Sequence, residues 1–298
     1  MAGRSPADQL GTLGITAVYT AQVARWGGLR GAELFDLPAG RVVFWMTNLV
    51  TEMARLLVPR AAPLAVSILH RQACIDEVLR RAGVRRLLEL ACGLSRRGIA
   101  FTDGDAGGGP GLEAVLVDLP AMIAFREELL SRTEAGRAVL SRPRLRVVAA
   151  DVVDADLDAI APAGPDLAVV AEGLCMYLDA VQQRNLWRRV ADLLRARGGG
   201  VFVFDLVPGP EQPAPGRVGR FLGWLMSRFT GGQGMVHDDR DRRRILAELV
   251  EAGFDEVECR EPAEVAAAWS LPRPEARSQQ LVFIAGVRPG AGGGVKRS

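Results

Sequence analysis

Four carboxylates stand at or just beyond the ends of four successive apolar runs. Glu89 falls in RRLLELACG, Asp118 in VLVDLP, Asp151 in VVAADVV and Glu172 in VVAEGL. If these runs are parallel strands of one open α/β sheet, their carboxyl ends meet at one edge, where such sheets bind ligands. Carboxylates at that edge accept hydrogen bonds from ribose hydroxyls and attract positively charged groups. The pattern predicts a polar, nucleoside-type ligand that lies across this edge.

The turns between the runs narrow the choice of nucleoside. The turn after the first run, ACGLSRRG (91–98), does not have the GxGxxG spacing that binds a dinucleotide pyrophosphate. An acid-rich site without a phosphate cradle suits a ligand that has a cationic sulfonium and no phosphate, which is S-adenosylmethionine (SAM). The glycine-rich segment DGDAGGGPG (103–111) lacks the lysine of a P-loop. We interpret it as a flexible loop, with a phosphate cradle as the alternative.

The surrounding pattern predicts the elements that must position these acids. Residues 1 to about 80 have apolar positions near a spacing of 3.6, which predicts helices over 15–26, 42–57 and 64–81. Beyond residue 85, short β-rich runs alternate with helical segments, which is typical of a doubly wound, mostly parallel sheet. The predicted strands are 86–90, 114–117, 145–149, 167–171, 200–206, 256–260 and 280–287. The predicted helices between them are 120–133, 179–196 and 239–252. No clear helix separates the last two strands, which predicts an antiparallel, hairpin-like end.

Composition limits the classes of partner. The 298 residues include 37 basic and 35 acidic side chains, a net charge of +2 that gives no electrostatic case for nucleic acid or an anionic membrane. None of the four cysteines lies in a CxxC or at ligand spacing from a histidine, so we expect reduced core thiols and no metal site. The start lacks an apolar signal region, and no run approaches the roughly 18 apolar residues of a membrane helix. We expect a cytoplasmic protein, and a homodimer remains open.

Several motifs resemble one family. LELACGLSRRG (88–98), VDLP (117–120), ADV (150–152) and above all EGLCMYL (172–178) are similar to motifs of the SAM-dependent leucine carboxyl methyltransferases and their bacterial O-methyltransferase relatives of secondary metabolism. The resemblance spans roughly residues 64–206. The family's first motif is usually ELGAGLDTR. Here Ala91, Cys92 and Ser95 replace its Gly, Ala and Asp, whereas Gly93 and Arg97 remain.

The sequence pattern and the resemblance together predict a seven-stranded, Rossmann-like sheet and a domain plan. We predict an N-terminal helical lid over 1–82 and a SAM-binding domain over 83–288. A lid insertion after the fifth strand would cover 208–235, and residues 289–298 would form a disordered tail.

The resemblance also implies a role for each motif residue. Arg71, in LHRQACID, matches the arginine of an RTxxxD pattern and would pair with the methionine carboxylate. Glu172 would sit beside the methionine amino group, and Glu89 would orient the first turn and reach the same amine. The remaining predicted cofactor contacts are Ala91 and Gly93 along the methionine, Asp118 at the ribose, Leu119 beside it, and Asp151 and Val152 at the adenine.

Structural explanations compete with these roles. Arg71 can be a solvated helix residue, and Glu89 can cap the following helix. Asp118 can be only the N-cap of the 120–133 helix, and Asp151 only a turn residue. These explanations must hold at all four strands at once to displace the ligand site.

The acceptor decides whether a base is needed. Methyl transfer from a sulfonium depends mainly on alignment. A carboxylate acceptor is ionised at pH 7 and needs no base, whereas a hydroxyl gains from one. The candidates are His237 and Tyr177, which are equally explained as a helix-start residue and a packing residue. The predicted acceptor contacts are Asp205, Trp224 and Met226, of which the last two can instead pack the insertion onto the sheet.

These observations predict an O-methyltransferase that acts on a carboxyl or hydroxyl group of a small hydrophobic, polyketide-like metabolite. Two alternatives remain. The first is a SAM-binding protein without methyl transfer, such as a cyclase or a regulator. The second is a nucleotide-dependent oxidoreductase, against which the missing GxGxxG argues.

Overall fold

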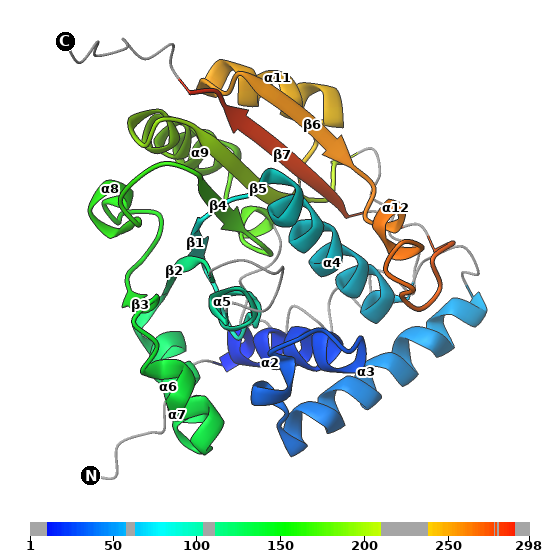
Figure 1. The fold of residues 1–298 in the computed structure, drawn as a ribbon. Helices are drawn as coiled ribbons and strands as arrows, with labels where there is room; N and C mark the ends of the chain where they lie inside the picture. Colours follow the sequence, from blue (N-terminus) through cyan, green and yellow to red (C-terminus); the bar gives the residue numbers. More distant parts are fainter. Residues whose placement is uncertain are drawn as a thin grey trace, which may run out of the picture.

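A single mixed sheet organises the molecule. The structure is a computed structural model that describes residues 11–57, 63–103, 111–209, 238–276, 278 and 280–289. Within these residues, seven strands form one sheet in the order β3-β2-β1-β4-β5-β7-β6 (Figure 1). The strands are β1 Arg86–Leu90, β2 Glu113–Asp118, β3 Leu145–Ala149, β4 Leu167–Ala171, β5 Gly200–Leu206, β6 Glu256–Arg260 and β7 Leu281–Val287. The first five are parallel, and β7 runs antiparallel to both β5 and β6. The chain is therefore a doubly wound, Rossmann-like α/β protein.

Helices cover both faces of this sheet. The α-helices are α2 Gly11–Trp26, α3 Pro38–Leu57, α4 Leu64–Ala82, α5 Arg97–Thr102, α6 Pro120–Ser131, α7 Glu134–Leu140, α8 Leu157–Ile160, α9 Ala180–Ala196, α11 Arg242–Ala252 and α12 Ala263–Ala266. Two short 3₁₀ helices are η1 Ala32–Phe35 and η2 Cys175–Tyr177. No helix among the described residues is long and apolar enough to cross a membrane.

Strand alternation divides the core in two. Successive side chains of a strand point to opposite faces, so Leu87 packs into one apolar cluster and Leu88 into the other. The first cluster joins the sheet to α4, α5, α6 and the N-terminal helices. The second joins it to α9 and α11, with Trp187 of α9 centred 5.3 Å from the ring of Phe204. Both faces of the central strands are thus buried, which explains why their sequences are continuous apolar runs.

The predicted strand boundaries agree with the structure to within one residue, whereas the helices predicted over 15–26 and 42–57 each begin four residues earlier, at Gly11 and Pro38. The strand predicted over 114–117 extends one residue at each end, and the strand predicted over 280–287 begins one residue later. The antiparallel pairing predicted for the chain end is confirmed, although the one-turn helix α12 interrupts the connection between β6 and β7. The glycine-rich segment at 104–110 lies outside the described residues, as do most of the predicted insertion and the tail.

The N-terminal helices lie against the carboxyl edge of the sheet. α2 packs on α3, α4 and η1, and η1 in turn contacts α6 (Figure 1). A Cβ added to Gly93, in the turn after β1, would lie 3.6 Å from the Cβ of Ala17 in α2. The first turn of the sheet is therefore covered by the segment that we predicted to be a lid.

Candidate functional site

The predicted acids gather at one edge of the sheet. Asp118 is the last residue of β2, and Glu172 directly follows β4. Asp151 follows β3 by two residues, and Asp205 is the next-to-last residue of β5. Glu89 lies one residue inside the end of β1. The parallel register of β1 to β5 brings these ends together, so residues up to 116 positions apart along the chain share one site.

Arg97 connects two of these acids, Glu89 and Glu172, with a third, Asp76 of α4. Its Nε lies 2.8 Å from Asp76 Oδ1, its Nη1 2.5 Å from Glu89 Oε1 and its Nη2 2.7 Å from Glu172 Oε2. Arg96 makes a further ion pair with Asp76. The Arg97 side chain is 2% exposed, so these bonds form in a poorly solvated environment where each counts for more than at the surface.

Arg71 of α4 makes a second hub. Its Nε donates to Glu172 Oε1 at 3.0 Å, and its Nη1 donates to Asp205 Oδ2 at 3.2 Å. The predicted alternative of a solvated arginine is wrong, because the Arg71 side chain is only 6% exposed. The guanidinium still has one further N–H on each terminal nitrogen, since its contacts with Glu172 and Asp205 use three of its five donors.

Burial and pairing compete in setting the acidity of these carboxyls. Burial favours the neutral form of Glu172, but the charges of Arg71 and Arg97 outweigh it and hold the pKa of Glu172 below its ordinary value. Burial raises the pKa of Asp205, and Arg71 offsets this only in part, because Glu172 acts in the opposite direction. Asp205 is fully buried and also accepts from Gly173 N at 2.6 Å and from Gln280. We expected Asp205 to face the acceptor, and the structure makes it a partner of Arg71.

Glu89 supports the first turn. Its Oε1 accepts from Ser95 Oγ at 2.7 Å as well as from Arg97. It makes no cap to α5, whose N-cap position has no side-chain hydrogen bond, so the alternative role as a helix cap is wrong. Glu89 Oε2 is buried and has no hydrogen-bond partner.

Asp118 differs from these acids because its partners are backbone amides. Its Oδ2 accepts from Gly93 N at 2.6 Å and its Oδ1 from Leu119 N at 2.7 Å. It is not the N-cap of α6, because Leu119 occupies that position and Asp118 makes no bond to the first turn of the helix. Burial raises the pKa of Asp118, and the two amides and Arg126 counteract part of the rise.

The first turn requires two left-handed residues. Gly93 has φ 48°, and Ala91 has φ 51°. A residue with a Cβ is strained at such an angle by about 1–2 kcal/mol, whereas glycine is not. Ala91 stands where the family has Gly, so the turn is strained at a position where glycine would not be.

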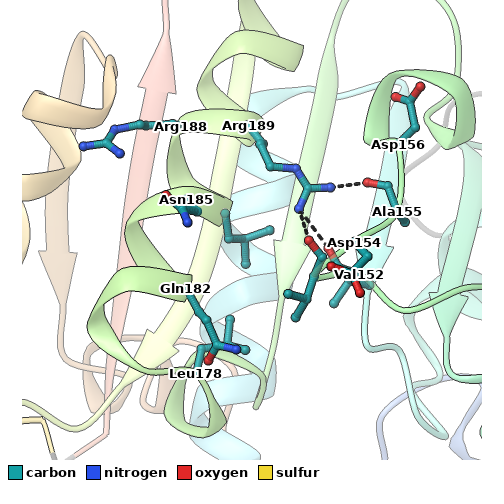
Figure 2. Close-up of a pocket in the computed structure, with 11 residues that line it drawn as sticks. Val152, Asp154, Ala155, Asp156, Leu178, Gln182, Asn185, Arg188 and Arg189 are labelled. Atoms are coloured by element: carbon teal, nitrogen blue, oxygen red, sulfur yellow. Dashed lines mark hydrogen bonds between the residues drawn. The ribbon is translucent and has the colours of Figure 1, made fainter.

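Asp151 and Val152 lie beside an open groove of about 660 Å³. Asp151 is exposed and its Oδ1 accepts from Val153 N at 3.0 Å, the turn geometry that was the alternative to a ligand role. Figure 2 shows the groove between the segment 152–156 and α9, with Arg189 reaching across to the carbonyls of Val152 and Ala155. Val152 links the groove to the predicted site, whereas Asp118, Glu172 and Gly93 do not line it.

The remaining predicted residues divide into two groups. Tyr177 lies in η2, where burial raises the pKa of its hydroxyl and the charges of Arg71 and Asp205 also act on it. His237, Trp224 and Met226 lie outside the described residues. Among the residues that are described, no three His, Cys, Asp or Glu side chains are arranged to hold a metal ion.

Sequence reasoning missed three buried partners. Asp76 and Arg96 complete the Arg97 cluster, and Arg126 of α6 donates to Gly93 O at 3.0 Å. A signal was available for Asp76, which is the acid of the RTxxxD pattern that begins at Arg71. Arg126 had a weaker one, since it falls on the apolar face of its helix among Met122, Ile123, Leu129 and Leu130.

Curated relatives come from mycobacteria. Proteins of Mycobacterium tuberculosis and Mycobacterium bovis that are provisionally named S-adenosyl-L-methionine-dependent methyltransferases are 32% identical to this chain over 152 residues. The match covers 48% of this chain and 47% of each relative, so it spans about half the length of these curated proteins.

Solved structures agree with the fold. A protein from Thermobifida fusca, provisionally assigned as a methyltransferase, superposes with a TM-score of 0.54 at 16% identity, over 91% of this chain and 94% of its own. A candidate exported protein from Bordetella parapertussis gives 0.53 at 17% identity, over 96% and 100%. At these identities the likeness concerns the fold alone. The family model for leucine carboxyl methyltransferase matches residues 41–191, which run from α3 to α9 and are half of the chain. The chain belongs to the leucine carboxyl methyltransferase family.

Proposed function

We propose that this protein is a SAM-dependent O-methyltransferase that acts on a carboxyl or hydroxyl group of a small hydrophobic, polyketide-like metabolite. The observation that carries the proposal is the hydrogen bond of 2.6 Å between Gly93 N and Asp118 Oδ2. It joins the acid at the end of β2 to the glycine turn after β1, the two parts of the edge that a ribose and the adjoining methionine chain would contact. Membership of the family and the names of the mycobacterial relatives support the same activity.

The charge of the site fits this cofactor. The arginine-paired cluster contains four carboxylates, Asp76, Glu89, Glu172 and Asp205, and three guanidinium groups, Arg71, Arg96 and Arg97. It therefore has a formal excess of one negative charge. SAM has a sulfonium, an ammonium and a carboxylate, a net charge of +1, and would balance the cluster. The half-exposed turn that contains Gly93 leaves room for its backbone to approach such a ligand.

Each described residue then has a proposed task. Asp118 accepts from the ribose hydroxyls with the lone pairs that the two amides leave free, and Leu119 packs beside the ribose. Glu172 attracts the ammonium, and Ala91 and Gly93 line the methionine chain. Arg71 donates to the methionine carboxylate through its two remaining N–H groups, while Asp205 and Glu172 fix its orientation. Asp151 and Val152 contact the adenine at the mouth of the groove.

The acceptor chemistry favours a group that arrives ionised. When bound, SAM would supply a methyl group made electrophilic by its positively charged sulfur, with SAH as the leaving group when the acceptor oxygen takes the methyl. Because burial raises the pKa of Tyr177, this residue stays protonated at pH 7 and can donate a hydrogen bond but not remove a proton. A carboxylate needs no base. His237 stays a predicted base for a hydroxyl acceptor, and Trp224 and Met226 stay predicted acceptor contacts.

The domain plan belongs to the same proposal. Residues 1–82 act as a lid, because α2 and η1 lie against the first turn and α6. Residues 83–288 form the cofactor domain, and the lid insertion at 208–235 stays a prediction, because most of it lies outside the described residues.

Calorimetric titration with S-adenosylhomocysteine (SAH), with NADH as a parallel ligand, tests the proposal. We expect micromolar binding of SAH and no binding of NADH. Binding of NADH alone would replace the proposal by an oxidoreductase, and binding of neither by folded protein would refute it. Product mass then separates transfer from its alternative: a gain of one methyl group supports transfer, and an unchanged mass with a new skeleton supports a cyclase.

A further inference from the structure

Arg126 is a fully buried arginine without an acidic partner. Its relative exposure is 0%, and its Nη1 donates to Gly93 O at 3.0 Å. Its guanidinium carbon lies 4.9 Å from the centre of the Phe35 ring, a cation–π contact. Its Nε and Nη2 are buried without a hydrogen-bond partner, and no carboxylate in the described ranges lies within ion-pair distance of it. Burial of a charge with so few partners is costly, so its position calls for a reason.

The reason lies at Gly93. Asp118 accepts from the N–H of this glycine and Arg126 donates to its carbonyl. Two side chains of opposite charge therefore bind the two backbone polar groups of the same residue. Gly93 has φ 48°, and a left-handed glycine in the turn between β1 and α5 has many alternative conformations unless its peptide groups are held. Phe35 of η1, 1% exposed, covers the guanidinium from the N-terminal side.

We propose that Arg126 is a positioning residue of the cofactor site, which fixes the Gly93 turn and, through it, the side chain of Asp118 that accepts from the ribose. The inference rests on the proposed function and names the residue on which its ribose contact depends. The ring of Phe35 takes the place of a carboxylate partner, which leaves the negative charge of Asp118 available to the ligand instead of neutralising it in a direct ion pair.

The charged surroundings of Asp118 agree with this task. Burial raises its pKa, whereas the amides of Gly93 and Leu119 and the charge of Arg126 lower it. The neighbouring Cys92 is neutral, because burial raises the pKa of its thiol far above the ordinary value. The charge of Glu89 also acts on Cys92 from the β1 side. Arg126 is therefore the cation that favours the ionised form of Asp118 within the described part of the chain.

The test is the pH dependence of SAH affinity in Arg126→Met and Arg126→Lys. Wild-type affinity should fall as the pH drops through the pKa of Asp118. Loss of the positive charge in Arg126→Met should raise that pKa. The acid limb, meaning the fall of SAH affinity at low pH, should then occur about one pH unit higher. We also expect about tenfold weaker binding at neutral pH, because the turn loses its carbonyl contact. Arg126→Lys keeps the charge and should keep the wild-type limb.

Controls separate this inference from the proposed function and from misfolding. Arg132→Met removes an exposed arginine that follows the same helix and should change neither affinity nor limb. If Arg126→Met does not fold, Arg126→Gln removes the same charge with a polar side chain and gives the same measurement. A folded, uncharged variant with the wild-type acid limb would overturn the inference and leave the proposed function standing. Failure of the wild-type protein to bind SAH would instead overturn the proposed function.

Discussion

The two halves of the carboxyl edge give their carboxylates different hydrogen-bond partners. Beside β1, β4 and β5, the carboxylates of Glu89, Glu172 and Asp205 are each bonded to a buried arginine. Beside β2 and β3, Asp118 and Asp151 accept from backbone amides, and within the described residues neither forms an ion pair. In the sequence all five are acids at strand ends, and nothing in their local pattern separates them.

The kind of partner determines how much of a carboxylate's charge is available to a ligand. When a carboxylate is bonded to guanidinium groups, its charge is neutralised and several of its lone pairs are occupied within the protein. A carboxylate held by amides keeps its full charge, and the amide bonds fix its direction without neutralising it. We infer that the arginine-paired half maintains the shape of the site and meets the methionine end of the ligand, and that the amide-held half contacts the nucleoside.

The largest expected effect is on stability in the arginine-paired half. Arg97→Met would leave Asp76, Glu89 and Glu172 without their shared partner, and breaking a buried ion cluster on one side costs about 3–5 kcal/mol. Urea denaturation measures the loss. Arg132→Met, which breaks an exposed pair with Glu128, should stay within about 0.5 kcal/mol. A loss as small as that of the control would show that the cluster does not support the fold.

The next effect is on binding in the amide-held half. Asp118→Ala removes the proposed ribose contact, and we expect SAH affinity to fall about 100-fold while the protein stays folded, since losing a buried acceptor costs about 1–3 kcal/mol of stability. Calorimetry and circular dichroism measure the two quantities. Asp151→Ala, at an exposed position, is the matched variant, with a fall of about tenfold. Wild-type affinity in folded Asp118→Ala would eliminate the ribose role.

A smaller effect distinguishes two acids within the arginine-paired half. The pKa of Glu172 is lowered in the folded protein, so its contribution to stability is present above the unfolded value of about 4.3 and is lost as the pH falls through the folded pKa. The pKa of Asp205 is raised, so its contribution is present below about 3.9 and is lost as the pH rises through the folded pKa.

Between about pH 3 and 5, the slope of the free energy of unfolding against pH should therefore change in opposite directions when Glu172 or Asp205 is replaced. Glu172→Gln should make the free energy of unfolding rise less steeply with pH than in the wild type. Asp205→Asn should make it rise more steeply. Equal slopes in the two variants would mean that Arg71 does not favour one carboxylate over the other.

The fold followed from local patterns, and the partners of the acids did not. Continuous apolar runs and alternating helices predicted the strands to within one residue, because both faces of a central strand are buried and its composition shows this directly. The gathering of the acids at one edge followed from parallel topology. Which acid meets which arginine depends on helices distant in sequence. Arg71 pairs with Asp205 across 134 positions, and no spacing rule encodes that contact.

The motif departures in the first turn were visible, but their consequence needed the backbone. Ser95, where the family has Asp, donates to Glu89. The turn thus keeps a link to β1 through a hydroxyl instead of a second carboxylate, which would repel Glu89. Arg126 was hidden for a different reason: an arginine on an apolar helix face resembles a residue that extends to solvent, and only the position of Gly93 O and Phe35 explains its burial.

The smallest expected effect concerns the strain at Ala91. Ala91→Gly relieves a left-handed φ that costs about 1–2 kcal/mol, but glycine adds about 0.4–1 kcal/mol of unfolded-chain entropy, so we expect a net stabilisation of up to about 1.5 kcal/mol. Ala138→Gly, on the exposed face of the right-handed helix α7, has only the entropic term and should lose about 1 kcal/mol. Changes of opposite sign in the free energy of unfolding of the two variants, measured by urea denaturation, would confirm the strain. Equal losses of stability would contradict it.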